Sequence, residues 1–205
     1  MFTRIEFIGL IDKKGNVHGV ALRPGLNLIT GRSATGKSSV IEIFDYCMGE
    51  SQNTIPAGVI SDNAEVYLLL LEIGIKRYLI GRKNTHFYLI DADVNEIKNK
   101  NDITLDLFDI TSIPSNVFKN QMNSLFGLDI ESTVEREEDR MRGGMKGTPS
   151  FRHTMSYILQ HQNLVANKLA LFYRFDEREK KEQTIDQFKI FAKYVDARYY
   201  SVSCR

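Results

Sequence analysis

The chain has 205 residues, which corresponds to one domain with an appendage or to two small domains. Apolar residues make up 42% and charged residues 26%, a composition that excludes a wholly disordered protein. The 27 basic and 26 acidic side chains leave a net charge of +1, which argues against binding of nucleic acid through bulk positive charge and leaves a local basic patch open.

The cysteines and the hydrophobic runs predict a cytoplasmic protein that does not associate with membranes. Cys47 and Cys204 lie in no CxxC motif and in no Cys/His cluster, so we expect reduced thiols. Arg4 and Glu6 interrupt the apolar stretch that a secretory signal would need. The longest apolar run, residues 66–71, is far shorter than the roughly 20 residues that span a bilayer.

The first fifty residues predict a hairpin, a strand and a helix in that order. Residues 2–8 alternate between two faces, residues 12–16 carry a turn signal, and residues 17–22 form a second strand, so a β-hairpin is expected. After a break at Pro24-Gly25, residues 26–30 have the pattern of a short buried strand. Apolar residues then recur at helical spacing from Ser38, and Gly49 is the predicted stop.

The remainder of the chain alternates between polar segments and regular structure. Residues 51–61 are predicted as a loop, residues 65–80 and 86–97 as strand, turn and strand, and residues 115–126 as a helix. Charges and glycines predict an exposed, mobile loop over residues 131–150, with order returning at 151–159. An amphipathic helix is expected over residues 176–200, with an apolar stripe formed by Ile185, Phe188, Phe191, Val195 and Tyr199.

Residues 31–38 match the phosphate-binding loop pattern G-x-x-x-x-G-K-[ST] without a mismatch. The predicted strand before the loop and the predicted helix after it are the context that this motif requires. Lys37 can place a positive charge beside the β- and γ-phosphates, and the Ser38 hydroxyl can ligate Mg²⁺. The candidate nucleotide-binding residues are Gly31, Arg32, Ser33, Ala34, Thr35, Gly36, Lys37, Ser38 and Ser39.

Further motifs that would define the class of nucleoside triphosphatase are misplaced or incomplete. Residues 99–102 spell the NKxD of a GTPase but do not follow a buried strand, and residues 12–15 spell DxxG but precede the phosphate loop, so we interpret both as turns. Residues 87–91 come nearest to a Walker B strand. Because Ala92 stands where a second acid is needed, we interpret Asp91 as a strand end or a hairpin turn.

Residues 22–31, running into residues 36–49, resemble the opening of the ABC-ATPase head of the SMC, RecF and RecN type. In that family a strand with a Pro-Gly-Leu-Asn run leads into the phosphate loop, and the next helix closes with a glycine. The Asp-Tyr-Cys-Met-Gly ending at residues 45–49 is similar to a bacterial family of SMC-like ATPases. The resemblance implies an α/β fold, the N-terminal lobe of a head over residues 1–175, with a mixed or antiparallel sheet beside the nucleotide. Residues 176–205 would begin a coiled coil.

Residues 156–163 resemble the Q-loop of the same family, an apolar strand that ends in a glutamine reaching Mg²⁺ and the γ-phosphate. The resemblance gives this role to Gln160, with Gln162 as the alternative, while a glutamine that only caps a strand end is the structural interpretation. Ser33-Ala34 depart from the Asn-Gly that is common in SMC loops. Residues 142–145 resemble the family's signature faintly but precede the Q-loop, so we interpret them as a flexible loop.

The resemblance implies binding of ATP and Mg²⁺, with catalytic roles for Lys37 and Gln160 and metal contacts from Ser38 and Gln160. In SMC-like heads the Walker B acids, the signature and the switch histidine come from a C-terminal half, so hydrolysis is expected only after completion by that half. The chain is expected to be half of a head, as a fragment or one part of a split protein. Its expected partners are the C-terminal half or a second head, in a homo- or heterodimer.

The machine implied by the resemblance acts in DNA repair, chromosome handling or anti-phage defence, with DNA as a possible partner. Two alternatives stay open. One is a non-catalytic assembly module whose nucleotide site is structural or vestigial. The other is a self-contained P-loop kinase or GTPase, which is weaker because its second motifs are missing.

Overall fold

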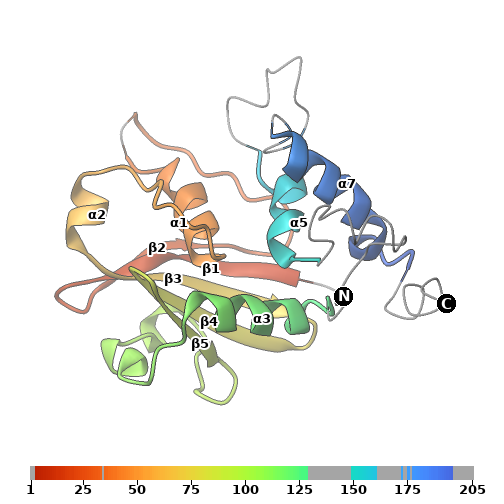
Figure 1. The fold of residues 1–205 in the computed structure, drawn as a ribbon. Helices are drawn as coiled ribbons and strands as arrows, with labels where there is room; N and C mark the ends of the chain where they lie inside the picture. Colours follow the sequence, from red (N-terminus) through yellow and green to blue (C-terminus); the bar gives the residue numbers. More distant parts are fainter. Residues whose placement is uncertain are drawn as a thin grey trace. The chain divides into compact units, whose positions relative to one another are not determined.

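Five strands form an antiparallel sheet in the order β2-β1-β3-β4-β5 (Figure 1). The computed structural model describes residues 3–33, 35–128, 149–160, 172, 175 and 177–195. The strands are β1 (Thr3–Asp12), β2 (Val17–Ala21), β3 (Ala64–Ile73), β4 (Lys76–Lys83) and β5 (His86–Asp91). The sheet belongs to the first of two compact units, Met1–Asn120, and the second unit is Gln121–Arg205. The boundary after residue 175, between the head and the start of a coiled coil, is implied by the family resemblance and stays a prediction.

The predicted N-terminal hairpin is confirmed by the pairing of β1 with β2. The Asp12 carboxylate accepts hydrogen bonds from the N–H groups of Lys14 (2.9 Å) and Asn16 (2.8 Å), which closes the turn. Gly9 pairs with Gly19, and a Cβ on Gly9 would lie 2.1 Å from the carbonyl oxygen of His18. The two glycines therefore let these strands approach closely.

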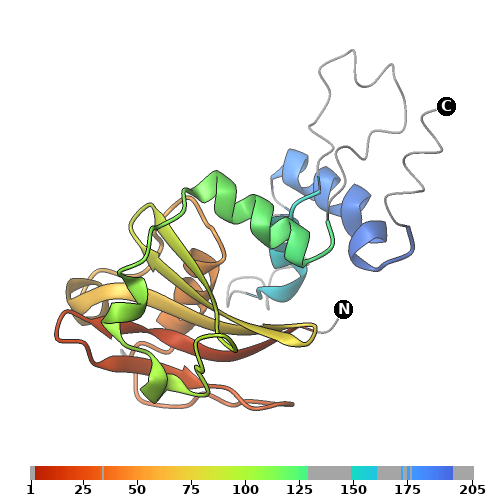
Figure 2. The ribbon, with the colours of Figure 1, turned by 90° about the horizontal axis from the view of Figure 1, so that it is seen from below.

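Both faces of the sheet are covered, which explains why residues 66–71 of β3 form an uninterrupted apolar run. On one face, Phe7, Leu68 and Leu70 belong to a core that also includes Ile97 and Phe108. These last two come from the segment after β5, which contains the short helices η1 (Lys100–Asp102) and η2 (Leu105–Phe108) and crosses this face (Figure 2).

The opposite face of the sheet carries α1 (Ser39–Cys47), the helix that follows the phosphate loop (Figure 1). Ile43, Phe44 and Cys47 of α1 are buried. The ring of Tyr46 meets that of Tyr67 on β3 edge-on, with centroids 5.4 Å apart. The helical spacing read from the sequence thus corresponds to the face that α1 packs on the sheet.

The strand predicted at residues 26–30 is wrong. No described strand pairs with this segment, and the exposed fraction is 99% for Leu26 and 85% for Leu28. The Asn27 side chain instead bonds the backbone of Arg23 and Gly25. An apolar run becomes a buried strand only when a sheet offers it neighbours, and here the described sheet forms without it. The loop predicted at residues 51–61 also needs correction, because α2 (Val59–Asn63) begins within it.

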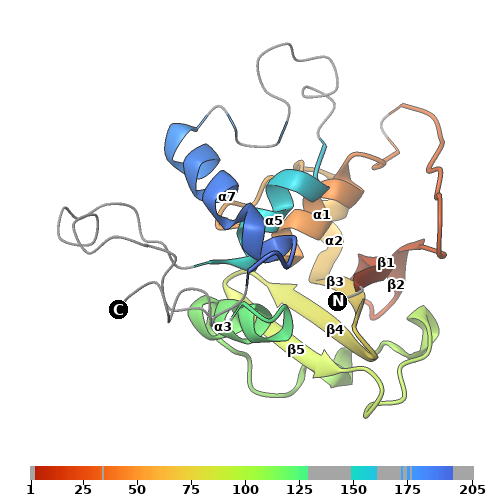
Figure 3. The same cartoon turned by 90° about the vertical axis from the view of Figure 1, so that its right-hand side faces the viewer.

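The helix α3 (Ser115–Leu125) confirms the prediction near residues 115–126, and it begins in the first unit and ends in the second. The second unit also contains α5 (Phe151–Ile158) and α7 (Arg178–Phe191), which pack side by side (Figure 3). The Tyr157 hydroxyl donates to the carbonyl oxygen of Thr184 (2.9 Å). His153 Nδ1 also hydrogen-bonds the amide oxygen of Gln187.

The strand implied before Gln160 is wrong, because the described residues there are helical. The Ser150 side chain accepts a hydrogen bond from the Arg152 N–H and caps α5, which is a typical helix start. Phe151 and Met155 are buried at a spacing of four residues. Ile158, which belongs to the segment that resembles the Q-loop strand, is instead 56% exposed at the end of this helix.

The predicted C-terminal helix is confirmed only over α7, which ends at Phe191, and Lys193 has a positive φ of 57°. The face of α7 that is buried carries Thr184, Gln187 and Ile190. Ile185 and Phe188 of the predicted stripe are exposed. Tyr199 and residues 129–148, which include the predicted mobile loop and residues 142–145, lie outside the described residues. None of the described helices is long and apolar enough to cross a membrane.

Candidate phosphate-binding site

Residues 31–38 lie between the unpaired segment 26–30 and the N-terminus of α1. The loop and the helix of the predicted strand–loop–helix arrangement are therefore present. The N–H groups of Val40 and Ile41 bond the carbonyl oxygens of Lys37 (3.3 Å) and Ser38 (3.2 Å), which continues the helical ladder up to the loop. The free N–H groups and the partial positive charge of a helix N-terminus favour an anion beside them.

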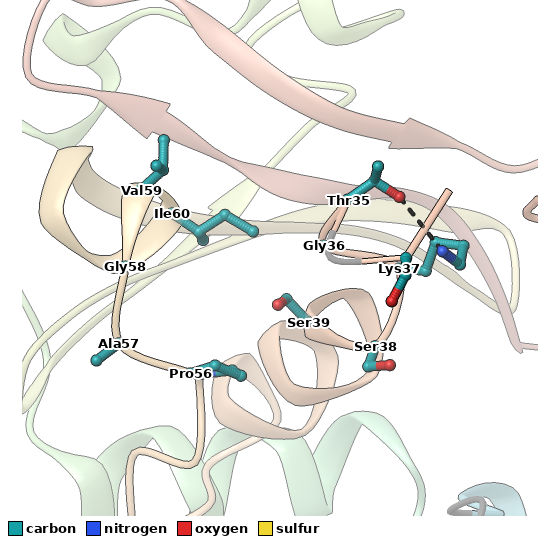
Figure 4. A pocket seen from close by; sticks show the side chains of 11 residues that line it. Thr35, Gly36, Lys37, Ser38, Ser39, Pro56, Ala57, Gly58, Val59 and Ile60 are labelled. Atoms are coloured by element: carbon teal, nitrogen blue, oxygen red, sulfur yellow. Dashed lines mark hydrogen bonds between the residues drawn. The ribbon is translucent and has the colours of Figure 1, made fainter. Parts of the chain in front are cut away.

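The loop wraps around its own lysine. Lys37 Nζ donates to the carbonyl oxygens of Gly31 (3.0 Å) and Arg32 (2.5 Å) and to Thr35 Oγ1 (3.3 Å), as Figure 4 shows for the last contact. Thr35 Oγ1 itself donates to the Arg32 carbonyl oxygen (2.8 Å). A phosphate oxygen would bind this ammonium more strongly than a neutral carbonyl oxygen does, because attraction between opposite charges adds to the hydrogen bond.

The backbone of this loop favours glycine at position 36. The φ of Gly36 is +81°, which L side chains rarely adopt, and a Cβ at this position would lie 2.9 Å from Cδ1 of Ile60. Gly31 has no positive φ, and its added Cβ would lie 3.1 Å from Thr35 Oγ1. Gly36 thus provides a backbone conformation that other residues rarely adopt, whereas Gly31 only leaves room for the Thr35 side chain.

A hollow of about 810 Å³ lies beside the loop, within the range of small-molecule sites. One wall is the loop and the start of α1, and the other is the segment from Pro56 to Ile60 (Figure 4). The described residues that line it are Ser33, Thr35, Gly36, Lys37, Ser38, Ser39, Pro56, Ala57, Gly58, Val59 and Ile60. The second wall was missed from the sequence because it carries no residue type that signals chemistry.

Arg82 of β4 fixes α1 from its other end. This side chain is buried, and Nη1 donates to the carbonyl oxygens of Tyr46 (2.5 Å) and Glu50 (2.6 Å), while Nε donates to that of Asn84 (3.1 Å). The guanidinium carbon also lies 3.6 Å from the centroid of the Tyr46 ring. A cation is favourable at a helix C-terminus, so Arg82 positions the helix that carries the loop.

The thiol of Cys47 does not take part in the site. Cys47 lies at the end of α1 with no exposed surface, and this burial raises its pKa to about 12. Because the thiolate is the reactive form, the buried thiol is inert near neutral pH.

The described polar residues outside the loop support the turn interpretations. Asp91 accepts hydrogen bonds from the N–H groups of Asp93 and Val94, both at 3.1 Å, and forms the turn after β5. Asp102 likewise accepts from the N–H groups of Lys98 (2.9 Å) and Asn99 (2.8 Å). These carboxylates are engaged by their own turns, as residues 12–15 are in the hairpin.

Gln160 follows α5 in the second unit, whereas all the described loop residues belong to the first. Its contact with Mg²⁺ and its catalytic role therefore stay predictions. Ala34 and the alternative Gln162 lie outside the described residues. Within the described part of the chain, no group of three or more His, Cys, Asp or Glu side chains could hold a metal ion.

No protein-family model matches the chain, and neither the curated proteins nor the solved structures give a match. The functional interpretation therefore depends on the loop, its surroundings and the resemblance in the sequence.

Proposed function

We propose that the chain binds ATP with Mg²⁺ through residues 31–38, as the nucleotide-binding half of an SMC-like ATPase head. The observation that carries the proposal is the loop wrapped around Lys37 at the N-terminus of α1, beside a hollow of about 810 Å³. A triphosphate needs a cation, free N–H donors and space, and these three occur together here.

Each group of the loop has a defined role in this proposal. The Lys37 ammonium leaves the carbonyl oxygens of Gly31 and Arg32 and contacts the β- and γ-phosphates. The first N–H groups of α1 hold the phosphate oxygens, and the Ser38 hydroxyl supplies one Mg²⁺ ligand. Bound Mg²⁺ would neutralise charge on the β- and γ-phosphates. One protein hydroxyl suits this ion, which keeps water and phosphate oxygens as its other ligands.

Turnover, in this proposal, needs groups from a C-terminal half or from a second head. The sequence resemblance assigns the acidic pair and the signature to those parts, and it assigns Gln160 to the γ-phosphate. The setting would be a machine for DNA repair, chromosome handling or anti-phage defence.

One observation favours the alternative of a non-catalytic assembly module. The Lys37 ammonium already has two carbonyl oxygens and one hydroxyl as partners, so a phosphate must compete with the loop itself. A vestigial site would keep this closed arrangement in the presence of nucleotide. Binding of MgATP separates the proposed function from a module with a vestigial site, whereas turnover after addition of the missing half separates it from a module with a structural nucleotide.

The test is isothermal titration calorimetry of the full chain with MgATP. Lys37→Ala should weaken binding by about tenfold or more, because a hydrogen bond to a charged group contributes about 1.5–3 kcal/mol. Lys100→Ala is the matched control, since Lys100 is exposed in η1 on the opposite face of the sheet. Equal affinities of the wild type and Lys37→Ala would refute the phosphate-loop assignment, and lack of binding by the wild type would favour the assembly module with a vestigial site.

A further inference from the structure

The wall opposite the phosphate loop differs from it in chemistry. Pro56, Val59 and Ile60, called here the apolar wall, present aliphatic side chains to the hollow. Figure 4 shows Ile60 extending from α2 toward Gly36 and Pro56 extending toward α1. Val59 also lines the hollow and is 80% exposed, so most of its apolar surface is accessible.

We propose that the apolar wall binds the nucleoside base of the triphosphate whose phosphates residues 31–38 hold. This inference rests on the proposed function, because it assigns the second half of the same ligand. A nucleoside triphosphate has one strongly anionic end and one flat, weakly polar end. The hollow offers cationic and N–H groups on one side, which suit the phosphates, and aliphatic groups on the other side, which suit the base.

The two halves of the hollow are adjacent. Ile60 Cδ1 would lie 2.9 Å from a Cβ added at Gly36, so the apolar wall begins where the phosphate loop ends. A ligand that fills the hollow of about 810 Å³ therefore touches both walls. Contact between the base and these aliphatic side chains increases the affinity for the ligand, because it removes apolar area from water.

The apolar wall is also held in place by the rest of the first unit. The Gly58 N–H donates to Ser61 Oγ (2.9 Å) at the start of α2. Lys13 ties the end of α2 to the N-terminal hairpin, because its Nζ donates to the carbonyl oxygen of Asp62 (2.6 Å) and its N–H to that of Asn63 (3.1 Å). A preorganised wall loses little conformational freedom when a base binds.

The experiment compares two ligands on the same variants of the full chain. Val59→Ser and Pro56→Ser should each weaken MgATP binding by about fivefold, because aliphatic contact with the base is lost. The same variants should bind magnesium tripolyphosphate within about twofold of the wild type, because this ligand has no base. Val94→Ser is the matched control, since Val94 is 77% exposed in the turn after β5 and does not line the hollow.

The outcomes separate this inference from the proposed function. If the wild type binds neither MgATP nor tripolyphosphate, the proposed function fails and the inference fails with it. If both ligands bind but neither affinity changes in Val59→Ser and Pro56→Ser, the base lies elsewhere and only the inference is overturned. Parallel losses for both ligands would also overturn it, since they would show that the apolar wall supports the loop rather than the base.

Discussion

Individual residues divide into those that a local motif identifies and those that only the fold brings into place. Lys37, Ser38 and Gly36 could be predicted because their roles follow from a fixed spacing of neighbouring residues. Arg82 could not, because its acceptor at Tyr46 is 36 residues away in the sequence. The place of Val59 in the lining of the hollow could not be predicted either, because nothing in the sequence around an exposed valine indicates that the fold brings it near the phosphate loop.

Arg82 leads to a prediction about stability. Arg82→Ala should lower the free energy of unfolding by about 2–4 kcal/mol, because it leaves buried carbonyl oxygens at the end of α1 without their donor. Chemical denaturation monitored by circular dichroism would measure the change. Arg23→Ala is the control, since Arg23 is exposed, and it should change stability by no more than about 0.5 kcal/mol. A similarly small effect of Arg82→Ala would contradict the anchoring role.

At the level of elements, the sequence predicted those whose partners are close in the chain. The β1–β2 hairpin and α3 follow from a local turn signal and from helical periodicity. The strand predicted at residues 26–30 is wrong because a short apolar run does not distinguish a strand from an unpaired segment, and the strand that the resemblance implies before Gln160 is the helix α5. In both cases the contacts made in the fold decide, and these involve distant residues.

The packing of α5 on α7 should depend on pH through His153. Burial lowers the pKa of this imidazole, the hydrogen bond that Nδ1 donates to the Gln187 amide oxygen raises it, and the charges of Arg152 and Lys180 lower it, so that the pKa lies below its usual range. The unfolded chain therefore takes up a proton at higher pH than the folded chain. The contribution of neutral His153 to stability is fully present above about pH 6.5 and is lost as the pH falls through the folded-state pKa.

Hydrogen exchange can measure this pH dependence directly. Protection of the amides of α5 and α7, corrected for intrinsic exchange, should be constant above about pH 6.5 and should fall as the pH is lowered below it. His153→Gln should reduce the pH dependence because glutamine does not titrate in this range. Equal pH dependence of the wild type and His153→Gln would exclude His153 as the source.

Over the whole molecule, apolar side chains occur both in the sheet and in a fully exposed segment. Leu68 and Leu69 of β3 have no exposed surface, whereas Leu26 and Leu28, which precede the phosphate loop, are almost completely exposed. Burial in the described fold therefore does not account for the apolar character of residues 26–30. The sequence predicted a buried strand there because its pattern reports a preference for burial, not the presence of a neighbour.

This distribution of apolar surface leads to a prediction that compares a pair of exposed leucines with one buried leucine. Leu26→Ser combined with Leu28→Ser should change the free energy of unfolding by no more than about 0.5 kcal/mol, because exposed side chains lose no packing. Leu68→Ala should cost about 2–5 kcal/mol, because it leaves a cavity between the sheet and the segment after β5. Chemical denaturation at one low protein concentration would compare the variants. A loss above about 1 kcal/mol in the Leu26/Leu28 variant would show that this segment packs in solution, because surface substitutions rarely have effects of that size.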